Sequence, residues 1–237
     1  MTRHIPRVYI PELGNDLVSL PNRALHHIRD VMRLKEHDNF IAFNEMDGEW
    51  ICEITDITKT SINARKISLT RKHMKSYKKA LAICHIKPVN MKLVIEKCAE
   101  LGVNDFYLLN GQYTNYHNER EKLQEIAYQA SEQSERLDIP MFHNDIDLRE
   151  FITNIPSQYN WYVALEREPT KNPLTKLKRK ENIGFIIGSE GGFSDDEREM
   201  LCNNVPSISL SQNILRSETA AISCLVLANI IQNDWNE

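Results

Sequence analysis

The residues of this chain best suited to chemistry lie in two short segments near its C-terminal end. The first segment covers residues 187–193 and reads IGSEGGF, and four of the chain's eight glycines lie within residues 184–192. An apolar strand-like run precedes it and a helix start follows it, which corresponds to the ligand-binding carboxyl edge of an open α/β sheet. Glycine allows positive φ and a close approach of the backbone to a ligand. These features predict a binding loop, and a turn that serves packing alone is the alternative.

The residues after this loop indicate which ligand it would accept. The helix that follows begins Ser194-Asp195-Asp196-Glu197, so carboxylates already match its positive dipole. A phosphate bound there would meet charge of its own sign. The glycine spacing fits neither G-x-G-x-x-G nor G-x-x-x-x-G-K-[ST]. We therefore expect a ligand with an adenosine, a cationic centre and no phosphate, which disfavours a dinucleotide or ATP site.

The second segment covers residues 210–220 and reads LSQNILRSETA. It leads through a polar turn into a helix that is apolar on nearly every side over residues 220–231. Such a helix must be buried in the core or in a subunit interface. Arg216 and Glu218 stand at its start, where an arginine gains nothing from the helix dipole. A structural ion pair is the plain interpretation of the two, and a role in chemistry is the alternative.

The charge of the chain is distributed unevenly. The formal net charge is −4, yet residues 1–79 carry fourteen Lys and Arg against ten Asp and Glu. No acidic residue occurs between Asp56 and Glu96, while ten basic residues do. This stretch runs through predicted strands into a predicted helix, so it belongs to folded structure. A basic band on an acidic protein favours a polyanion such as nucleic acid as partner, and a solvated surface is the alternative.

The elements that must position these segments fall into two groups. Over the N-terminal part, short alternating runs separated by turn residues predict strands, with one short helix over residues 22–34. This pattern predicts a small β-barrel. From Ala80 onward, apolar runs alternate with helical periodicity, which predicts an α/β domain with a mainly parallel sheet. We place the boundary between residues 72 and 73, so the predicted domains are 1–72 and 73–237.

The composition also excludes several classes of protein. The first residues contain no apolar signal-peptide core, and the most apolar stretch, residues 219–231, is too short and too polar to span a bilayer. Five cysteines without a C-x-x-C pair argue against a structural zinc site or a disulfide framework. The adjacent His26 and His27 suit a surface or an RNA-facing position better than metal ligation. We expect a reduced, cytoplasmic enzyme without a metal.

The order of the motifs resembles that of one known family. IGSEGGFSDDE, followed about twenty residues on by LSQNILRSETA and then by the apolar C-terminal helix, resembles the SPOUT class of methyltransferases and, within it, the RsmE family. Supporting matches are HHIRDVMRLKEHD near the start, KCAELGV at residues 97–103 and QASEQSER at residues 129–136. Each motif alone is weakly specific, whereas their order across most of the chain is specific.

The resemblance implies a fold and an activity. The implied fold is an N-terminal PUA-like β-barrel followed by a SPOUT α/β domain with a trefoil knot, which no periodicity could reveal. The implied activity is transfer of a methyl group from S-adenosylmethionine to N3 of a uridine in 16S ribosomal RNA, within the small ribosomal subunit. A homodimer with the cofactor site near its interface is also implied, and it would account for the apolar C-terminal helix.

The resemblance also assigns site residues. Arg216 is expected to stabilise the negative charge that spreads onto O2 and O4 once N3 has lost its proton, while Glu190 or Glu218 orients Arg216 or accepts that proton. The expected cofactor-binding residues are Leu165, Ile187, Gly188, Ser189, Glu190, Gly191, Gly192, Leu210, Ser211, Asn213, Ile214, Leu215 and Thr219. The expected RNA-binding residues are Arg3, Arg7, His26, His27, Arg29, Arg33, Arg71, Lys72, Lys87, Lys97, Gln133 and Arg136.

The sequence departs from the family pattern at four positions. Ser189 stands in place of a usual proline and Ser211 in place of a glycine; Asn213 replaces an arginine, and His37 replaces a glycine of the barrel. Both serines are small enough to keep a pocket that is built from backbone groups. Asn213 leaves Arg216 as the stronger candidate for an arginine at the reaction centre.

Two other functions stay open at this point. A ribosome-assembly protein that binds RNA without chemistry suits the barrel and the basic band equally well, and only the two C-terminal segments argue against it. A nucleotide-dependent oxidoreductase on a doubly wound sheet is disfavoured by the missing glycine fingerprint and by the acidic helix start.

Overall fold

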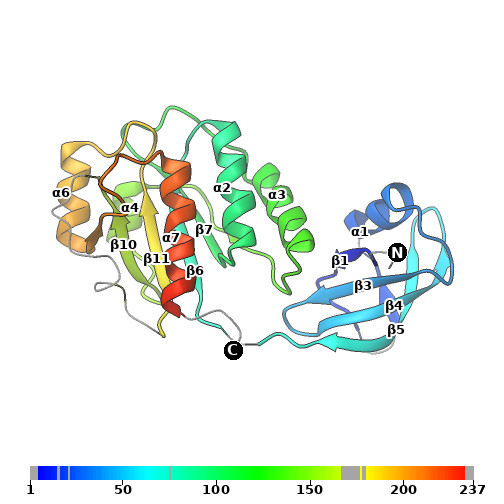
Figure 1. Ribbon diagram of the computed structural model, residues 1–237. Coiled ribbons are helices and arrows are strands. Elements are labelled where there is room, and N and C mark those ends of the chain that lie inside the picture. The colour runs from blue at the N-terminus through cyan, green and yellow to red at the C-terminus, as the bar shows by residue number, and fades with distance from the viewer. Residues whose placement is uncertain are drawn as a thin grey trace. The chain divides into compact units, whose positions relative to one another are not determined.

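The computed structural model describes residues 5–14, 17–20, 22–74, 76–166, 177 and 180–232 (Figure 1). The chain divides into two compact units, the first made of residues 1–75 and 131–139 and the second of residues 76–130 and 140–237. The boundary between residues 72 and 73 stays a prediction, and the grouping of 131–139 with the first unit had no signal in the sequence. In the described ranges, no helix combines the length and the apolar character that crossing a membrane requires.

The described residues of the first unit form a five-stranded mixed sheet in the order β1-β3-β4-β5-β2. β1 runs parallel to β3, and the other neighbouring strands are antiparallel. Short alternating strands were predicted for this unit, and the sheet confirms them. It also contains β2, which was not predicted. The strands are β1 (Arg7–Tyr9), β2 (Leu17–Ser19), β3 (Asn39–Asn44), β4 (Gly48–Ile57) and β5 (Ile62–Arg71).

Turns and a short helix complete this unit. The predicted helix over residues 22–34 consists of α1 (Asn22–His26) followed by a π-helical turn over His27–Val31. Its buried residues Ala24, Leu25 and Ile28 share the core with the sheet. His37, which replaces a family glycine, has φ +70°, and this is the left-handed conformation that glycine adopts without strain.

The described residues of the second unit form a seven-stranded sheet in the order β12-β10-β11-β6-β7-β8, with β9 also paired to β7. All of these pairings are parallel. The predicted parallel α/β sheet is therefore confirmed. The strands are β6 (Lys79–Cys84), β7 (Asp105–Asn110), β8 (Met141–Phe142), β9 (Ile146–Asp147), β10 (Asn160–Ala164), β11 (Ile183–Ile187) and β12 (Ser207–Ile208).

Helices cover both faces of this sheet (Figure 1). α2 (Pro88–Glu100), α3 (Arg120–Gln133) and α7 (Ser217–Gln232) contribute to one core cluster, and α4 (Leu148–Thr153) and α6 (Asp195–Asn204) contribute to another. Alternate residues of β6 divide between the two clusters: Leu81 and Ile83 belong to the first, and Ala80 and Ala82 to the second. β6 is therefore buried on both faces, which explains why its sequence is a nearly continuous apolar run.

The strand order determines where the site can form. β10 lies between β12 and β11, and all three strands run in the same direction. Their carboxyl ends therefore meet at one edge, so the segments that follow them along the chain come together. Two of these segments are the glycine-rich loop after β11 and the polar turn after β12.

Candidate active site

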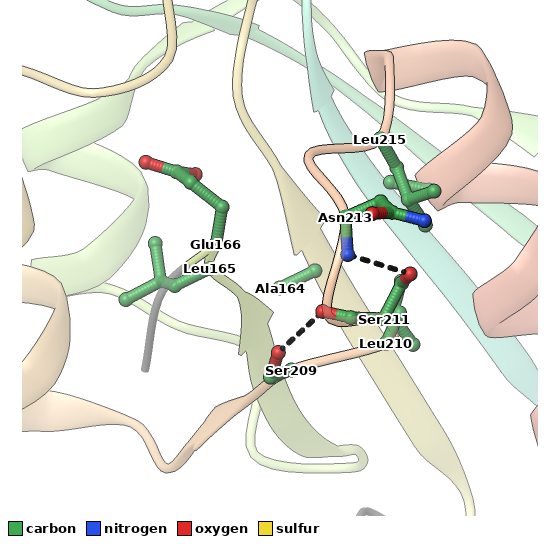
Figure 2. Close-up of a pocket in the computed structure, with 9 residues that line it drawn as sticks. Ala164, Leu165, Glu166, Ser209, Leu210, Ser211, Asn213 and Leu215 are labelled. Atoms are coloured by element: carbon green, nitrogen blue, oxygen red, sulfur yellow. Dashed lines mark hydrogen bonds between the residues drawn. The ribbon is translucent and has the colours of Figure 1, made fainter. Parts of the chain in front are cut away.

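Two neighbouring cavities open at this carboxyl edge, and they share Ala164, Glu166, Leu215 and Ala220. The first has a volume of about 50 Å³ (Figure 2) and is lined by Ala164, Leu165, Glu166, Ser209, Leu210, Ser211, Asn213, Leu215 and Ala220. The second is wider, and it adds Asn90, residues 187–193, Ile214 and Arg216–Glu218. Every residue predicted to bind a cofactor, apart from Thr219, lines one of the two.

Thr219, which lines neither cavity, and the lining residues outside the predicted set each have a simple structural explanation. Thr219 is exposed on the first turn of α7, between the lining residues Glu218 and Ala220, so the expectation that it lines the pocket is corrected. Glu166 lies directly after the predicted binding residue Leu165, in the segment that follows β10. Asn90 on α2 had no signal in the sequence, because only the tertiary fold brings it to this edge.

The glycine-rich loop is held in a tight conformation. Gly192 has φ +73°, and its N–H donates a hydrogen bond to Ser189 O at 3.0 Å. The Ser189 hydroxyl donates to Tyr113 O at 3.0 Å, so this serine anchors the loop where the family usually has proline. A Cβ at Gly191 would lie 2.9 Å from Tyr113 Cβ, which leaves no room for a side chain. The loop therefore presents mainly backbone to the cavity.

The turn after β12 is held by serine hydroxyls. Ser209 Oγ donates to Ser211 O at 3.2 Å, and Ser211 Oγ accepts from the Asn213 N–H at 3.0 Å (Figure 2). The side chain that replaces a family glycine thus stabilises the turn instead of filling the cavity. This geometry leaves the backbone along the turn available to a ligand.

The charged side chains of the site lie at different depths. Arg216 is 83% exposed, and its Nη1 lies 3.9 Å from Glu218 Oε1, which is too long for a hydrogen bond. The Glu218 side chain is only 10% exposed, and its Oε2 has no hydrogen-bond partner among the described residues. Glu190 Oε1 accepts a hydrogen bond from the Lys87 N–H at 2.8 Å, so this carboxylate links the glycine loop to the start of α2.

The donor set of the cavities fits a cationic ligand that carries no phosphate. Among the described residues, those that line the cavities include three carboxylates, on Glu166, Glu190 and Glu218, and one cation, on Arg216. A capping box stands beside them at the start of α6: Glu197 Oε2 accepts from the Ser194 N–H at 2.9 Å, and Ser194 Oγ accepts from the Glu197 N–H. The buried, unpartnered oxygen of Glu218 can receive a positive charge or a hydrogen-bond donor from a ligand.

Two of the predicted RNA-binding arginines are corrected by their surroundings. The Arg7 side chain is 4% exposed, and its Nη2 lies 2.6 Å from Glu49 Oε2. The Arg136 side chain is 9% exposed, and its Nη2 lies 2.6 Å from Asp138 Oδ2. A buried arginine requires such a partner because an isolated charge is too costly to desolvate. Neither guanidinium is available to a phosphate group.

The other predicted RNA-binding residues vary in availability. Arg71 is partly exposed but binds Glu49 and the carbonyl of Glu135, while Lys97 binds Glu96 and Glu100. Arg3 lies outside the described residues. The rest are at least partly exposed: His26, His27, Arg29, Arg33, Lys72, Lys87 and Gln133.

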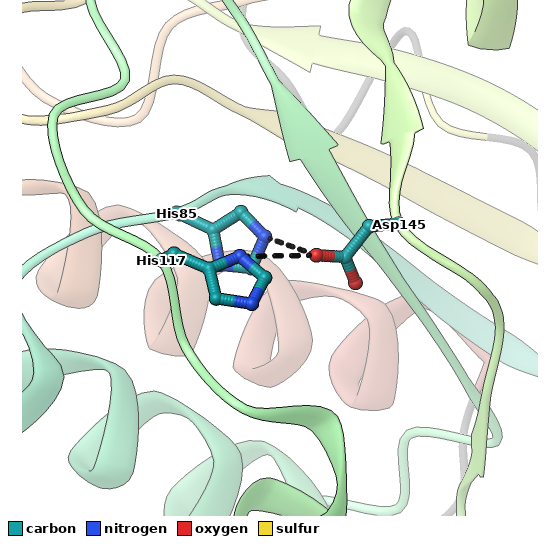
Figure 3. A group of neighbouring side chains, drawn as sticks. All are labelled: His85, His117 and Asp145. Atoms are coloured by element: carbon teal, nitrogen blue, oxygen red, sulfur yellow. Dashed lines mark hydrogen bonds and ion pairs between the residues drawn. The ribbon is translucent and has the colours of Figure 1, made fainter.

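One cluster of possible metal ligands stands out among the described residues, namely His85, His117 and Asp145, whose ligand atoms all lie within 4.8 Å of one another (Figure 3). The buried His85 accepts a hydrogen bond at Nδ1 from the Asn118 N–H at 3.2 Å, and its Nε2 lies 2.9 Å from Asp145 Oδ2. Nε2 must therefore carry the proton and donate to Asp145. Burial lowers the pKa of His85, which favours this neutral form. His85 and Asp145 therefore form a hydrogen-bonded pair, since a metal could bind at Nε2 only by displacing its proton.

Comparisons with known proteins agree with the motifs. A family model described as an RNA methyltransferase domain matches residues 73–229, and one described as an RNA methyltransferase PUA domain matches residues 20–67. The chain is 31% identical over 219 residues to the ribosomal RNA small subunit methyltransferase E of Rickettsia conorii, covering 90% of this chain and 89% of that protein.

Solved structures have the same fold. A putative methyltransferase of Legionella pneumophila, in complex with the cofactor S-adenosylmethionine, is 26% identical with a TM-score of 0.86 and covers 96% of this chain and 98% of its own. The ribosomal RNA small subunit methyltransferase E of Neisseria gonorrhoeae, bound to S-adenosylmethionine, is 24% identical with a TM-score of 0.87 and covers 98% of this chain and all of its own. The chain therefore belongs to the RsmE family of RNA methyltransferases, with an N-terminal PUA domain and a C-terminal SPOUT domain.

Proposed function

We propose that this protein methylates N3 of a uridine in the 16S ribosomal RNA of the small subunit, with S-adenosylmethionine as methyl donor. The observation that carries the proposal is that two separate segments, residues 187–193 and a turn within residues 209–216, line one pair of neighbouring cavities. The names of the Rickettsia relative and of the two structures that contain the cofactor support it.

The cofactor supplies a methyl group on a positively charged sulfur. Backbone groups of residues 187–192 and 209–215 would hold its adenosine part, because glycines and short turns keep side chains out of the way. The carboxylates that line the cavities match a cationic centre, and the acidic start of α6 disfavours a phosphate. Glu218 is the carboxylate best placed to interact with the ligand, since one of its oxygens has no partner within the described residues.

Arg216 is the residue proposed to act on the uridine. When N3 loses its proton, negative charge spreads onto O2 and O4, and a guanidinium close to them lowers the energy of that state. Arg216 is exposed at the rim of the wider cavity and makes no hydrogen bond through its side chain within the described residues, so it is free to contact RNA. The Glu218 carboxylate lies 3.9 Å away, and we propose that its charge orients the guanidinium, which makes Glu218 a positioning residue.

N3 lies on the pairing edge of uridine, so the base must be unpaired or flipped out of its helix at a cost of a few kcal/mol. Contacts to neighbouring phosphates would offset this cost. The PUA domain, proposed as residues 1–72, and exposed basic residues such as Arg33, Lys72 and Lys87 are the proposed source of these contacts.

We also propose a cytoplasmic homodimer. α2 packs against α7, and both helices expose large apolar side chains, namely Val89 and Leu93 on α2 and Val226 and Ile230 on α7. Exposed apolar residues on adjacent helices are typical of an interface. The cytoplasm follows from the proposed substrate, because small ribosomal subunits are found there.

The function is tested by incubating the protein with methyl-labelled S-adenosylmethionine and small subunits that lack the modification. We expect label in the ribosomal RNA, mapped by mass spectrometry to N3 of one uridine. Label on another atom would refute the N3 assignment. Subunit binding without cofactor binding, measured by calorimetry, would instead support a protein that binds RNA without chemistry.

A further inference from the structure

The loop between β7 and α3 exposes two aromatic side chains next to the proposed active site. It covers residues 111–118 and reads GQYTNYHN. The side chains of Tyr113 and Tyr116 are 43% and 40% exposed. Neither ring packs against another aromatic ring, and neither hydroxyl makes a hydrogen bond, within the part of the chain that the structure describes. Two partly exposed tyrosines three residues apart on one loop point to a role at the surface.

The first half of this loop is fixed by the active-site elements. The Gln112 N–H donates to Glu197 Oε1 at 2.7 Å, and Glu197 is the buried carboxylate of the α6 capping box. The Gly111 N–H donates to Thr114 Oγ1 at 2.9 Å. Tyr113 O accepts the hydrogen bond from Ser189 on the glycine loop. Tyr113 is thus placed against the loop that lines the cofactor cavity.

The second half of the loop is fixed by the histidine–aspartate pair. The buried Asn118 donates its N–H to His85 Nδ1 and its side-chain amide to Ile86 O at 2.9 Å. His85 in turn donates to Asp145, and the exposed His117 lies beside it with ring centroids 5.1 Å apart (Figure 3). The backbone of the loop is therefore anchored at both ends, while Tyr113, whose ring lies partly against Gly191, and Tyr116 both stay partly exposed. An anchored backbone lowers the entropy cost of binding at these side chains.

The charge around the loop indicates what kind of contact these rings can make. Next to the loop, α6 begins with the exposed Asp195 and Asp196, which repel phosphate groups and acidic partners. The neutral face of a tyrosine ring carries no net charge, so these carboxylates do not prevent it from stacking on a base. Nucleobases stack on aromatic side chains with little dependence on sequence, and unpaired bases are what RNA-binding proteins recognise in this way.

We propose that Tyr113 and Tyr116 stack on unpaired bases that flank the target uridine in the RNA substrate. This inference rests on the proposed function, because it places an RNA strand across the cofactor cavity. Stacking would compensate for the base–base contacts that are lost when the uridine leaves its helix. The two tyrosines would hold the strand, whereas Arg216 acts on the target base.

The test measures binding of small ribosomal subunits that lack the modification by filter binding, which needs no methyl transfer. We expect Tyr113→Ala and Tyr116→Ala each to weaken binding by about 5- to 100-fold, the range of one lost base stack. Tyr113→Phe and Tyr116→Phe are the matched controls, and they should bind within about twofold of the wild type because the ring is kept. Affinity for S-adenosylmethionine without RNA should stay unchanged in all four variants.

Ultraviolet crosslinking of the wild type to the subunits gives a second readout, and we expect nucleotide adducts on Tyr113 or Tyr116. Three results would overturn the inference: alanine variants that bind like the wild type, a parallel loss of cofactor affinity, or crosslinks to a ribosomal protein instead of RNA. A wild type that binds subunits through these tyrosines but transfers no methyl group would refute the proposed function and leave the stacking role intact. A wild type that binds no subunits would refute the inference.

Discussion

Replacing Arg216 with alanine separates a role in the reaction from a role in the fold. The side chain is 83% exposed, and its nearest carboxylate oxygen is 3.9 Å away on Glu218. Although the Glu218 carboxylate is buried, the guanidinium is exposed to solvent and makes no hydrogen bond with it, so the pair should contribute about 0–1 kcal/mol to stability. The urea midpoint of Arg216→Ala should therefore differ little from the wild type. A group that stabilises charge in the transition state is worth far more, and its removal typically lowers kcat by about 10²–10³-fold.

The assay is transfer of a labelled methyl group to small ribosomal subunits at saturating cofactor, together with calorimetry of S-adenosylmethionine binding. We expect kcat to fall by about 10²–10³-fold while cofactor affinity changes by no more than about threefold. Arg216→Lys should fall in between, because lysine keeps the charge but loses the planar fork of donors.

The matched control is Arg149→Ala. Arg149 is also exposed and also lies 3.9 Å from a carboxylate oxygen, that of Asp196, but it does not line the cavities. We expect this variant to behave like the wild type in both assays. Equal losses of turnover and of cofactor affinity in Arg216→Ala, or a clear drop in its urea midpoint, would show that Arg216 is structural and would refute the reasoning.

Two further predictions concern stability. A Cβ at Gly184 would lie 2.5 Å from Trp161 Cε3, so Gly184→Ala should lower the free energy of unfolding by about 1–3 kcal/mol, and adding Trp161→Leu should recover part of it in urea titrations. Burial lowers the pKa of His85 below its usual value of 6.5, so the unfolded chain binds a proton that the folded chain does not. The free energy of unfolding of the wild type should therefore fall as the pH decreases from about 7 to 5. This loss should be smaller in His85→Gln, and identical pH profiles of the two proteins would contradict the prediction.

Local patterns were sufficient to predict most strands of the two sheets, though not β2, and the ligand-binding edge. The apolar run of β11, the glycines after it and the Ser194–Glu197 capping box each depend on neighbouring residues, and the structure contains all three. Strand alternation with helices predicts parallel strands, and parallel strands bring successive carboxyl ends to one edge. The two C-terminal segments could therefore be paired before their contacts were known.

Long-range contacts could not be predicted in the same way. Nothing in the local sequence shows that Arg7 is buried against Glu49, 42 residues away, or that His85 pairs with Asp145. The aromatic loop was missed as well, although Tyr113 and Tyr116 stand among polar residues, a pattern that fits exposed rings on a loop. The trefoil knot stays a prediction, because a knot depends on how connections pass each other in space.

The most direct test of the central claim is a crystal structure of the protein with S-adenosylmethionine. The account predicts density for the adenosine between residues 187–192 and 209–215, with Glu218 directed toward the ligand and no side chain of the two segments displaced from the cavity lining. Cofactor density elsewhere on the molecule, or the two segments closed against each other with the ligand excluded, would contradict it.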